Sequence, residues 1–220
     1  MSELFEKLGR RFAQQEQRRR SAQRNQLALW IGRIVIAFNE LEARLAKEVA
    51  AELGHETVSV QDMLQASMSF GQKLDIFSAL LVERHRNDST HLDYINSVLS
   101  ALSAAEDCRN AVVHSAWTTH PVFSTGFERR KAKTRGRKGL KVDIGAVNIA
   151  GLREAVGDIR ALGSIATSVA RHPKTAARYN QEAFKRATDR LRAACQPPPH
   201  ANGRSNRSLV ALLVDPIFGG

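Results

Sequence analysis

The sequence is poor in aromatic residues and has no long apolar run. Aromatic residues make up 6% of the 220 positions, so the core must consist mainly of Leu, Ile, Val and Ala, a mixture that favours helices over a β-sandwich. No apolar run approaches the ~20 residues that span a bilayer. The N-terminus also lacks the apolar segment of a signal peptide. We therefore expect a cytoplasmic protein that has no membrane partner.

Cysteine is almost absent as well. The two cysteines, Cys108 and Cys195, have no C-x-x-C partner, and the seven histidines form no H-x-x-x-H or H-E-x-x-H pair. Because metal sites usually show such spacings, the sequence suggests no metal and no other cofactor. In a reducing compartment the two cysteines are not expected to form a disulfide.

Positive charge, by contrast, is abundant and clustered. The net charge of +11 favours a polyanionic partner such as nucleic acid. One cluster near the start contains Arg18, Arg19, Arg20 and Arg24. A second, which we take as the candidate RNA-binding set, contains Arg129, Arg130, Lys131, Lys133, Arg135, Arg137 and Lys138 and is followed by Lys141. The alternative for each cluster is an ordinary solvated surface.

Apolar residues recur at helical spacing along most of the chain. The pattern predicts helices over 3–20, 27–49, 69–85, 90–117, 149–170 and 174–194. Gly54 is expected to end the second of these, and Pro121 bars extension of the fourth. We divide the chain into an N-terminal amphipathic and basic helix (1–24), a helical domain (25–195), and a Pro-rich linker with a C-terminal tail (196–220).

Residues 120–147 have a different pattern. Leu140, Val142 and Ile144 alternate with charged residues, which is typical of a strand. We therefore expect a β-hairpin, or two short strands, with a basic tip. The predicted fold class is mainly α, with a small basic β-hairpin inserted after the fourth helix.

The six-residue pattern R-N-x-x-x-H occurs twice, at Arg86–His91 and at Arg109–His114. In the first copy, the residues between Asn87 and His91 are typical of a helix cap, so its Arg and His are expected in different elements. The second copy lies inside a predicted helix, and this places its residues on one element.

The helix of the second copy has an apolar stripe that becomes polar. Ile95, Val98, Leu99 and Leu102 form one face, and the same face continues through Glu106, Arg109, Asn110 and Val113. The desolvation of a lone buried Arg or Glu would cost considerable free energy. Either Glu106 and Arg109 pair structurally, or this half of the helix faces a cleft or a subunit interface; we favour the cleft.

The second copy, followed by Ser115-Ala116-Trp117, resembles the R-x4-6-H motif of the HEPN superfamily. These are small helical-bundle proteins that include many prokaryotic toxins and defence ribonucleases. The segment 38–42 is similar to the family's first long helix with its acidic residue, and 70–74 to the segment that often precedes the motif helix. The resemblance covers about residues 26–117 and implies an antiparallel helical bundle.

The resemblance also implies an activity, that of a metal-independent endoribonuclease acting as a toxin or antiviral defence component. Arg109 would bind the scissile phosphate, His114 would act as general acid or base, and Asn110 would orient the histidine or the phosphate. Glu106 and Glu42 are candidates for holding Arg109. The product would be a 2′,3′-cyclic phosphate. The implied partners are RNA, a second copy in a homodimer whose two motifs line one cleft, and an antitoxin protein.

Two other functions fit the same sequence. The chain can be a non-catalytic RNA- or nucleotide-binding module that uses the basic span after the fourth helix. It can also be a helical interaction protein in which the polar half of the motif helix is simply a dimer or antitoxin interface.

Overall fold

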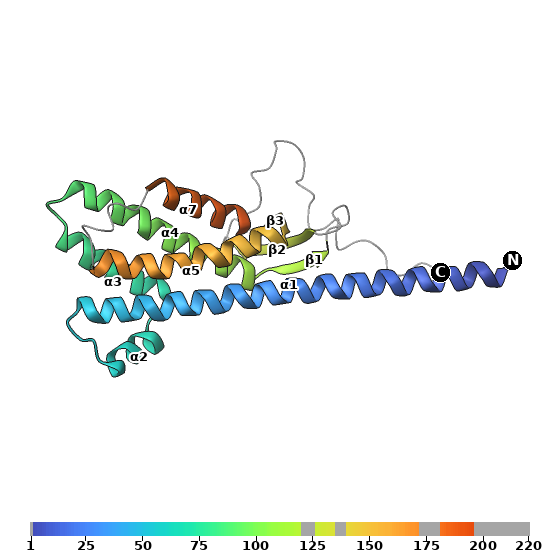
Figure 1. Cartoon of the computed structure of the whole chain (residues 1–220), viewed down its shortest axis with the longest axis horizontal. Coiled ribbons are helices and arrows are strands. Elements are labelled where there is room, and N and C mark those ends of the chain that lie inside the picture. The colour runs from blue at the N-terminus through green and yellow to red at the C-terminus, as the bar shows by residue number, and fades with distance from the viewer. Residues whose placement is uncertain (1, 120–125, 135–139, 172–180, 196–220) are drawn as a thin grey trace.

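The computed structural model describes residues 2–119, 126–134, 140–171 and 181–195, which form a helical bundle and one small sheet (Figure 1). The helices are α1 (Ser2–Glu52), α2 (Val58–Ser67), α3 (Phe70–Arg84), α4 (Ser89–Val113), α5 (Ile149–Arg171) and α7 (Gln181–Cys195). The strands are β1 (Ala116–Thr119), β2 (Gly126–Thr134) and β3 (Leu140–Asn148). The predicted mainly helical fold with a small antiparallel sheet is confirmed, while the predicted tail, 196–220, lies outside the described residues.

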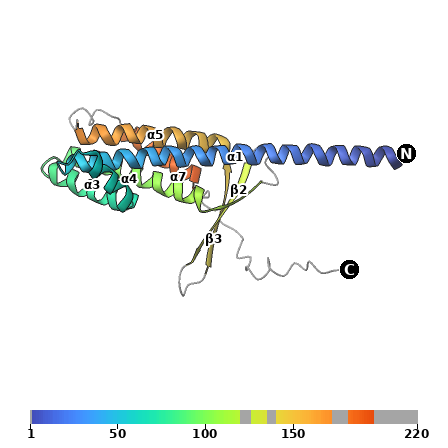
Figure 2. The same cartoon turned by 90° about the horizontal axis from the view of Figure 1, so that it is seen from below.

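The first helix, α1, is continuous, although the sequence predicted two helices over 3–20 and 27–49. Residues 21–26 contain neither Gly nor Pro, so no residue there interrupts the helix. Nearly all side chains from 5 to 26 are exposed, and in Figures 1 and 2 this outer part of α1 extends well beyond the bundle. Residues 2–24 are therefore the outer part of α1 and not a separate helix.

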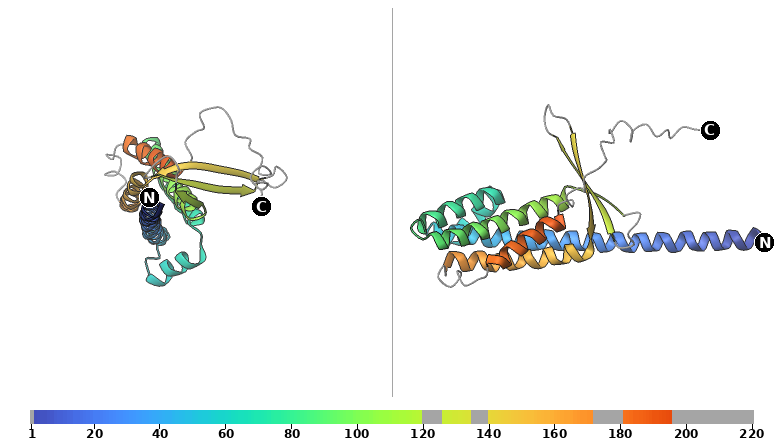
Figure 3. Two further views of the ribbon diagram at one scale, coloured as in Figure 1. Left: turned by 90° about the vertical axis from the view of Figure 1, so that its right-hand side faces the viewer. Right: turned by 90° about the horizontal axis from the view of Figure 1, so that it is seen from above.

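The inner part of α1 is the centre of the bundle. It packs mainly against α5 and also against α2, α3 and α4, while α7 covers α4 and α5. The end-on view in Figure 3 (left) shows the helices gathered around this axis. The predicted stripe of α4 is part of the core, because Ile95, Val98 and Leu102 are buried.

Local signals fix the passage from α1 to α3. Gly54 has φ 75°, a left-handed conformation that favours glycine, and it follows the end of α1 as predicted. At the start of α3, Ser69 and Gln72 form a capping box: Gln72 N donates to Ser69 Oγ at 3.3 Å, and Ser69 N donates to Gln72 Oε1 at 2.8 Å. Phe70 then packs against Phe38 of α1, with ring centroids 4.8 Å apart.

The sheet is an antiparallel meander in the order β1-β2-β3. The predicted hairpin corresponds to β2 and β3, and it projects to one side of the bundle (Figure 2). Trp117 of β1 pairs with Arg129 of β2, which in turn pairs with Gly145 of β3. The strand β1 was not expected, since the sequence predicted helix through Trp117.

The fourth helix therefore ends earlier than predicted. Its last residue is Val113, and His114 is the C-cap, with φ −98° and ψ 28°, whose N–H still donates to Asn110 O at 3.2 Å. The indole Nε1 of Trp117 donates to Val112 O at 3.0 Å. Trp117 of β1 thus supplies a donor to one of the carbonyls of the last helical turn, which have no partner within the helix.

A buried ion pair joins α3 to α1. The side chain of Lys73 is completely buried, and its Nζ donates to Glu42 Oε1 and to Met68 O, both at 2.7 Å. An ammonium group in this position would be very costly without its carboxylate. The pair therefore fixes the position of α3 along α1.

We predict that Glu42→Ala destabilises the protein by about 3 kcal/mol, because it leaves Lys73 buried without a counter-charge. Urea unfolding followed by circular dichroism measures this change. The matched control is Glu6→Ala, which breaks an exposed pair with Arg10 and should leave the midpoint unchanged. Equal midpoints for Glu42→Ala and wild type would contradict the prediction.

Candidate functional site

Arg109 lies on the side of α4 that faces α1. Its Cζ is 5.8 Å from the centroid of the Phe38 ring, and Nη1 donates to Asn110 Oδ1 at 2.8 Å. Within the described part of the chain the guanidinium makes no ion pair, and its Nε is buried without a hydrogen-bond partner. A half-buried cation without a carboxylate partner is suited to binding an anion.

Asn110 hydrogen-bonds to both other residues of the motif. Its side chain accepts from Arg109, and its backbone carbonyl accepts the helical hydrogen bond from the backbone N–H of His114. The imidazole of His114 is exposed at the open end of the helix. The structure therefore places the three predicted catalytic residues at the end of α4, with Arg109 toward α1 and His114 toward solvent.

Two basic residues of β2 also reach this end of α4. Lys131 Nζ donates to Asn110 O at 3.3 Å, and Arg129 Nη1 donates to Ala111 O at 3.5 Å. Carbonyl groups at a helix C-terminus carry partial negative charge, which these cations offset. Lys131 thus brings an additional positive charge beside the motif.

The predicted RNA-binding set is divided by the structure. Arg129 is only 2% exposed and serves the helix end, so we do not retain it in that set. Arg130 is exposed and pairs with Glu128 at 2.5 Å. Lys133 belongs to β2, whereas Arg135, Arg137 and Lys138 lie outside the described residues.

The two supporting carboxylates do not hold Arg109 by ion pairs. Glu42 is bound to Lys73 instead. Glu106 lies beside the start of α3, where its Oε2 would be 3.9 Å from a Cβ at Gly71. Burial raises the pKa of Glu106, repulsion from Asp107 and Glu42 raises it further, and attraction to Arg109 opposes this. Glu106 and Arg109 therefore do not form the structural ion pair that was one of the two alternatives from the sequence.

The first R-N-x-x-x-H copy lies elsewhere and is divided between elements, as predicted. Arg86 is in the turn after α3 and pairs with Glu83 at 3.0 Å. His91 is in the first turn of α4, where Nδ1 is 2.7 Å from Asp88 Oδ2 and the ring stacks on His85 with centroids 5.3 Å apart. Asp88 also accepts from His91 N, so these residues cap a helix.

One expectation about cysteine is wrong. Cys108, which precedes Arg109, is disulfide-bonded. The other cysteine of the sequence, Cys195, is the last residue of α7, the helix that packs on α4. Spacing along the sequence gave no sign of this packing. Disulfides are typical of oxidising compartments. The expectation of no disulfide rested on a reducing, cytoplasmic location.

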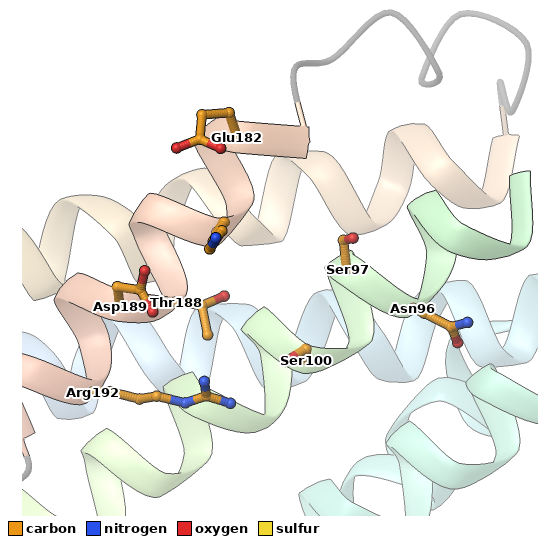
Figure 4. Close-up of a pocket in the computed structure, with 8 residues that line it drawn as sticks. Asn96, Ser97, Ser100, Glu182, Thr188, Asp189 and Arg192 are labelled. Carbon is orange, nitrogen blue, oxygen red and sulfur yellow. The ribbon is translucent and has the colours of Figure 1, made fainter. Parts of the chain in front are cut away.

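A polar groove between α4 and α7 was also missed from the sequence (Figure 4). Its volume is about 510 Å³. It is lined by Asn96, Ser97, Ser100, Glu182, Lys185, Thr188, Asp189 and Arg192. Acidic and basic groups are equally represented, so the groove has no net charge that would select an anion.

Comparison with known proteins gives no relative: no family model, no curated protein and no solved structure matches the chain. None of the described helices is long and apolar enough to cross a membrane. Within the described ranges, no group of three or more His, Cys, Asp or Glu side chains is placed to hold a metal ion.

We predict that Glu106→Gln raises the melting temperature at pH 7. A carboxyl whose pKa is raised in the folded state favours folding when protonated, and stability falls as the pH rises from its ordinary pKa through the raised value. The gain should therefore vanish at a pH below the ordinary value of 4.5. Thermal melts at both pH values test this. A lower melting temperature for the variant at pH 7 would show that the carboxylate is needed by Arg109.

Proposed function

We propose that this protein is an endoribonuclease whose active site is the end of α4, with Arg109, Asn110 and His114 as its catalytic residues. The observation that supports this most is the half-buried guanidinium of Arg109, which has no carboxylate partner among the described residues and lies at the same helix end as the exposed His114. Lys131 adds positive charge on the same asparagine. Such a group can bind a phosphate and leave an imidazole free to move a proton.

In the proposed reaction the ribose 2′-oxygen attacks the phosphorus that Arg109 binds. The new O2′–P bond forms as the P–O5′ bond breaks, which yields a 2′,3′-cyclic phosphate and a free 5′-hydroxyl. His114 takes the proton of the 2′-hydroxyl or gives a proton to the leaving 5′-oxygen. Arg109 and Lys131 offset the charge that develops on the phosphoryl oxygens.

One imidazole cannot supply both proton transfers in the same step. We therefore propose a homodimer in which His114 of each copy lies at a shared cleft, one as base and the other as acid. The exposure of His114 at the helix end is compatible with this. A toxin or defence role, with an antitoxin protein that covers this end, extends the same proposal.

A second candidate function is RNA binding without cleavage. It is favoured by the exposed arginines of the outer part of α1, such as Arg18 and Arg24, and by Arg130 of β2. These side chains can contact phosphates regardless of the chemistry at His114.

The test is cleavage of mixed-sequence RNA in the presence of EDTA, with product ends analysed by mass spectrometry. We expect cyclic phosphate ends from wild type. Arg109→Ala should lose roughly 100-fold or more in rate, in line with removal of one oxyanion-stabilising donor. His114→Ala should lose on the order of 100-fold or more, as for a general acid or base.

Matched controls come from the same chain. Arg86→Ala removes an exposed arginine from the other R-N-x-x-x-H copy, and His55→Ala removes an exposed histidine beyond the end of α1. Both should cleave at the wild-type rate. Cleavage by Arg109→Ala and His114→Ala at the wild-type rate would reject the proposed site, and RNA binding with no cleavage by any variant would select the second candidate.

A further inference from the structure

A shallow hollow lies between α1 and α5, away from the residues discussed so far. Its volume is about 440 Å³. It is lined by Trp30 and Arg33 of α1 and by Arg153, Val156, Gly157 and Arg160 of α5. An aromatic ring thus shares one small surface with three arginines.

The tryptophan ring lies between guanidinium groups from both helices. Arg33 Cζ is 4.5 Å from the ring centroid of Trp30, and Arg153 Cζ is 5.4 Å from it. The ring is half-buried, both arginines are exposed, and Val156 beside them is buried. The guanidinium groups lie over the ring, so the planar surface offered to another planar group is a solvent-exposed guanidinium supported by Trp30.

The hollow is also unbalanced in charge. Arg160 makes a long contact with Glu40, 3.8 Å between Nε and Oε2, and both side chains are more than half exposed. Within the described residues, neither Arg33 nor Arg153 makes an ion pair. Two cations thus remain available for phosphate oxygens.

We propose that this hollow binds single-stranded RNA, with a base stacked on a guanidinium that Trp30 supports and the flanking phosphates on Arg33 and Arg153. Aromatic and guanidinium surfaces accept bases of any sequence, and a basic groove follows the backbone. The choice of RNA as ligand rests on the proposed function. The hollow would hold the strand, while the end of α4 would cut it.

The geometry of the bundle relates the two sites. Figure 1 shows that α4 runs antiparallel to α1, and Arg109 lies beside Phe38. His114 is five positions further along α4, which brings the helix end level with about residue 33 of α1. Phe38 and Arg33 differ by about 140° around α1. A strand in the hollow would therefore pass around α1 to reach Arg109.

The same face of α1 continues beyond the bundle. Arg19 is eleven positions before Trp30, which places it about 20° from Trp30 around the helix and about 16 Å along it. Arg19 is exposed, and its contact with Glu16 is long, 3.8 Å between Nη1 and Oε2. A bound strand can therefore extend from the hollow onto the outer part of α1.

The experiment measures binding of a dye-labelled single-stranded RNA by fluorescence anisotropy over a range of salt concentrations. The full chain with His114→Ala is used throughout so that the probe is not consumed. Trp30→Ala should raise Kd about tenfold, because the guanidinium groups lose the ring that supports them and with it one stacked base. Arg33→Gln with Arg153→Gln should raise Kd and reduce the slope of log K against log salt by about 1.4, because each phosphate contact contributes about 0.7 for single strands.

A steric variant tests the hollow without removing a charge. A Cβ at Gly157 meets nothing within 4 Å, so a side chain can start there without a clash. Gly157→Leu should place apolar atoms in the hollow and raise Kd several-fold, and leucine favours the helix more than glycine does. The charge control is Arg86→Gln with Arg186→Gln, two exposed arginines on other elements. Thermal melts confirm that each variant is folded.

The outcomes separate this inference from the proposed function. If the Arg33/Arg153 variant and Gly157→Leu bind RNA as the control pair does, the hollow is not an RNA site, even if Arg109→Ala and His114→Ala abolish cleavage. If these variants lose binding while no protein cleaves RNA, the hollow is an RNA site and the nuclease proposal fails.

Discussion

The structure around the candidate site depends on how the last turn of α4 is completed. A helix leaves its final carbonyl groups without internal partners, and here the sheet supplies the donors: Trp117 from β1, with Arg129 and Lys131 from β2. These contacts attach the sheet to the bundle and stop the helix at Val113. They also leave His114 exposed while Arg109, one turn earlier, is held against α1.

Much of the fold could be predicted because it follows from short-range periodicity. The apolar spacing in α4 and α5 and the alternation around Val142 identify the helices and β3 directly. The end of α4 could not be predicted, because residues 114–117 contain no helix breaker. Ala116 and Trp117 instead pair with β2, which begins several residues further along the chain. The continuity of α1 was missed for the opposite reason, since polar residues can extend a helix without any apolar stripe.

The candidate site was identified by the change from apolar to polar residues along one face of α4, and not by the R-N-x-x-x-H motif alone. Two copies of R-N-x-x-x-H exist, and only the copy at Arg109 replaces the apolar face of its helix with polar groups. The hydrogen-bond and ion-pair partners of these polar groups could be identified only from the structure. Glu42 was expected near Arg109, but Lys73 is buried more deeply, and the greater cost of leaving that charge unpaired gives it the carboxylate. The disulfide bond of Cys108 likewise depends on packing between helices that are far apart in the sequence.

The outer part of α1 has a consequence for how the molecule moves through water. A helix of 51 residues is about 77 Å long, whereas a spherical chain of this size would have a radius of gyration of about 17 Å. A rod attached to a compact body experiences more friction than a sphere of equal mass. A single copy should therefore diffuse and sediment slowly for its mass and elute early from a sizing column. Subunit number should be taken from scattered light or sedimentation equilibrium, which report mass independently of shape.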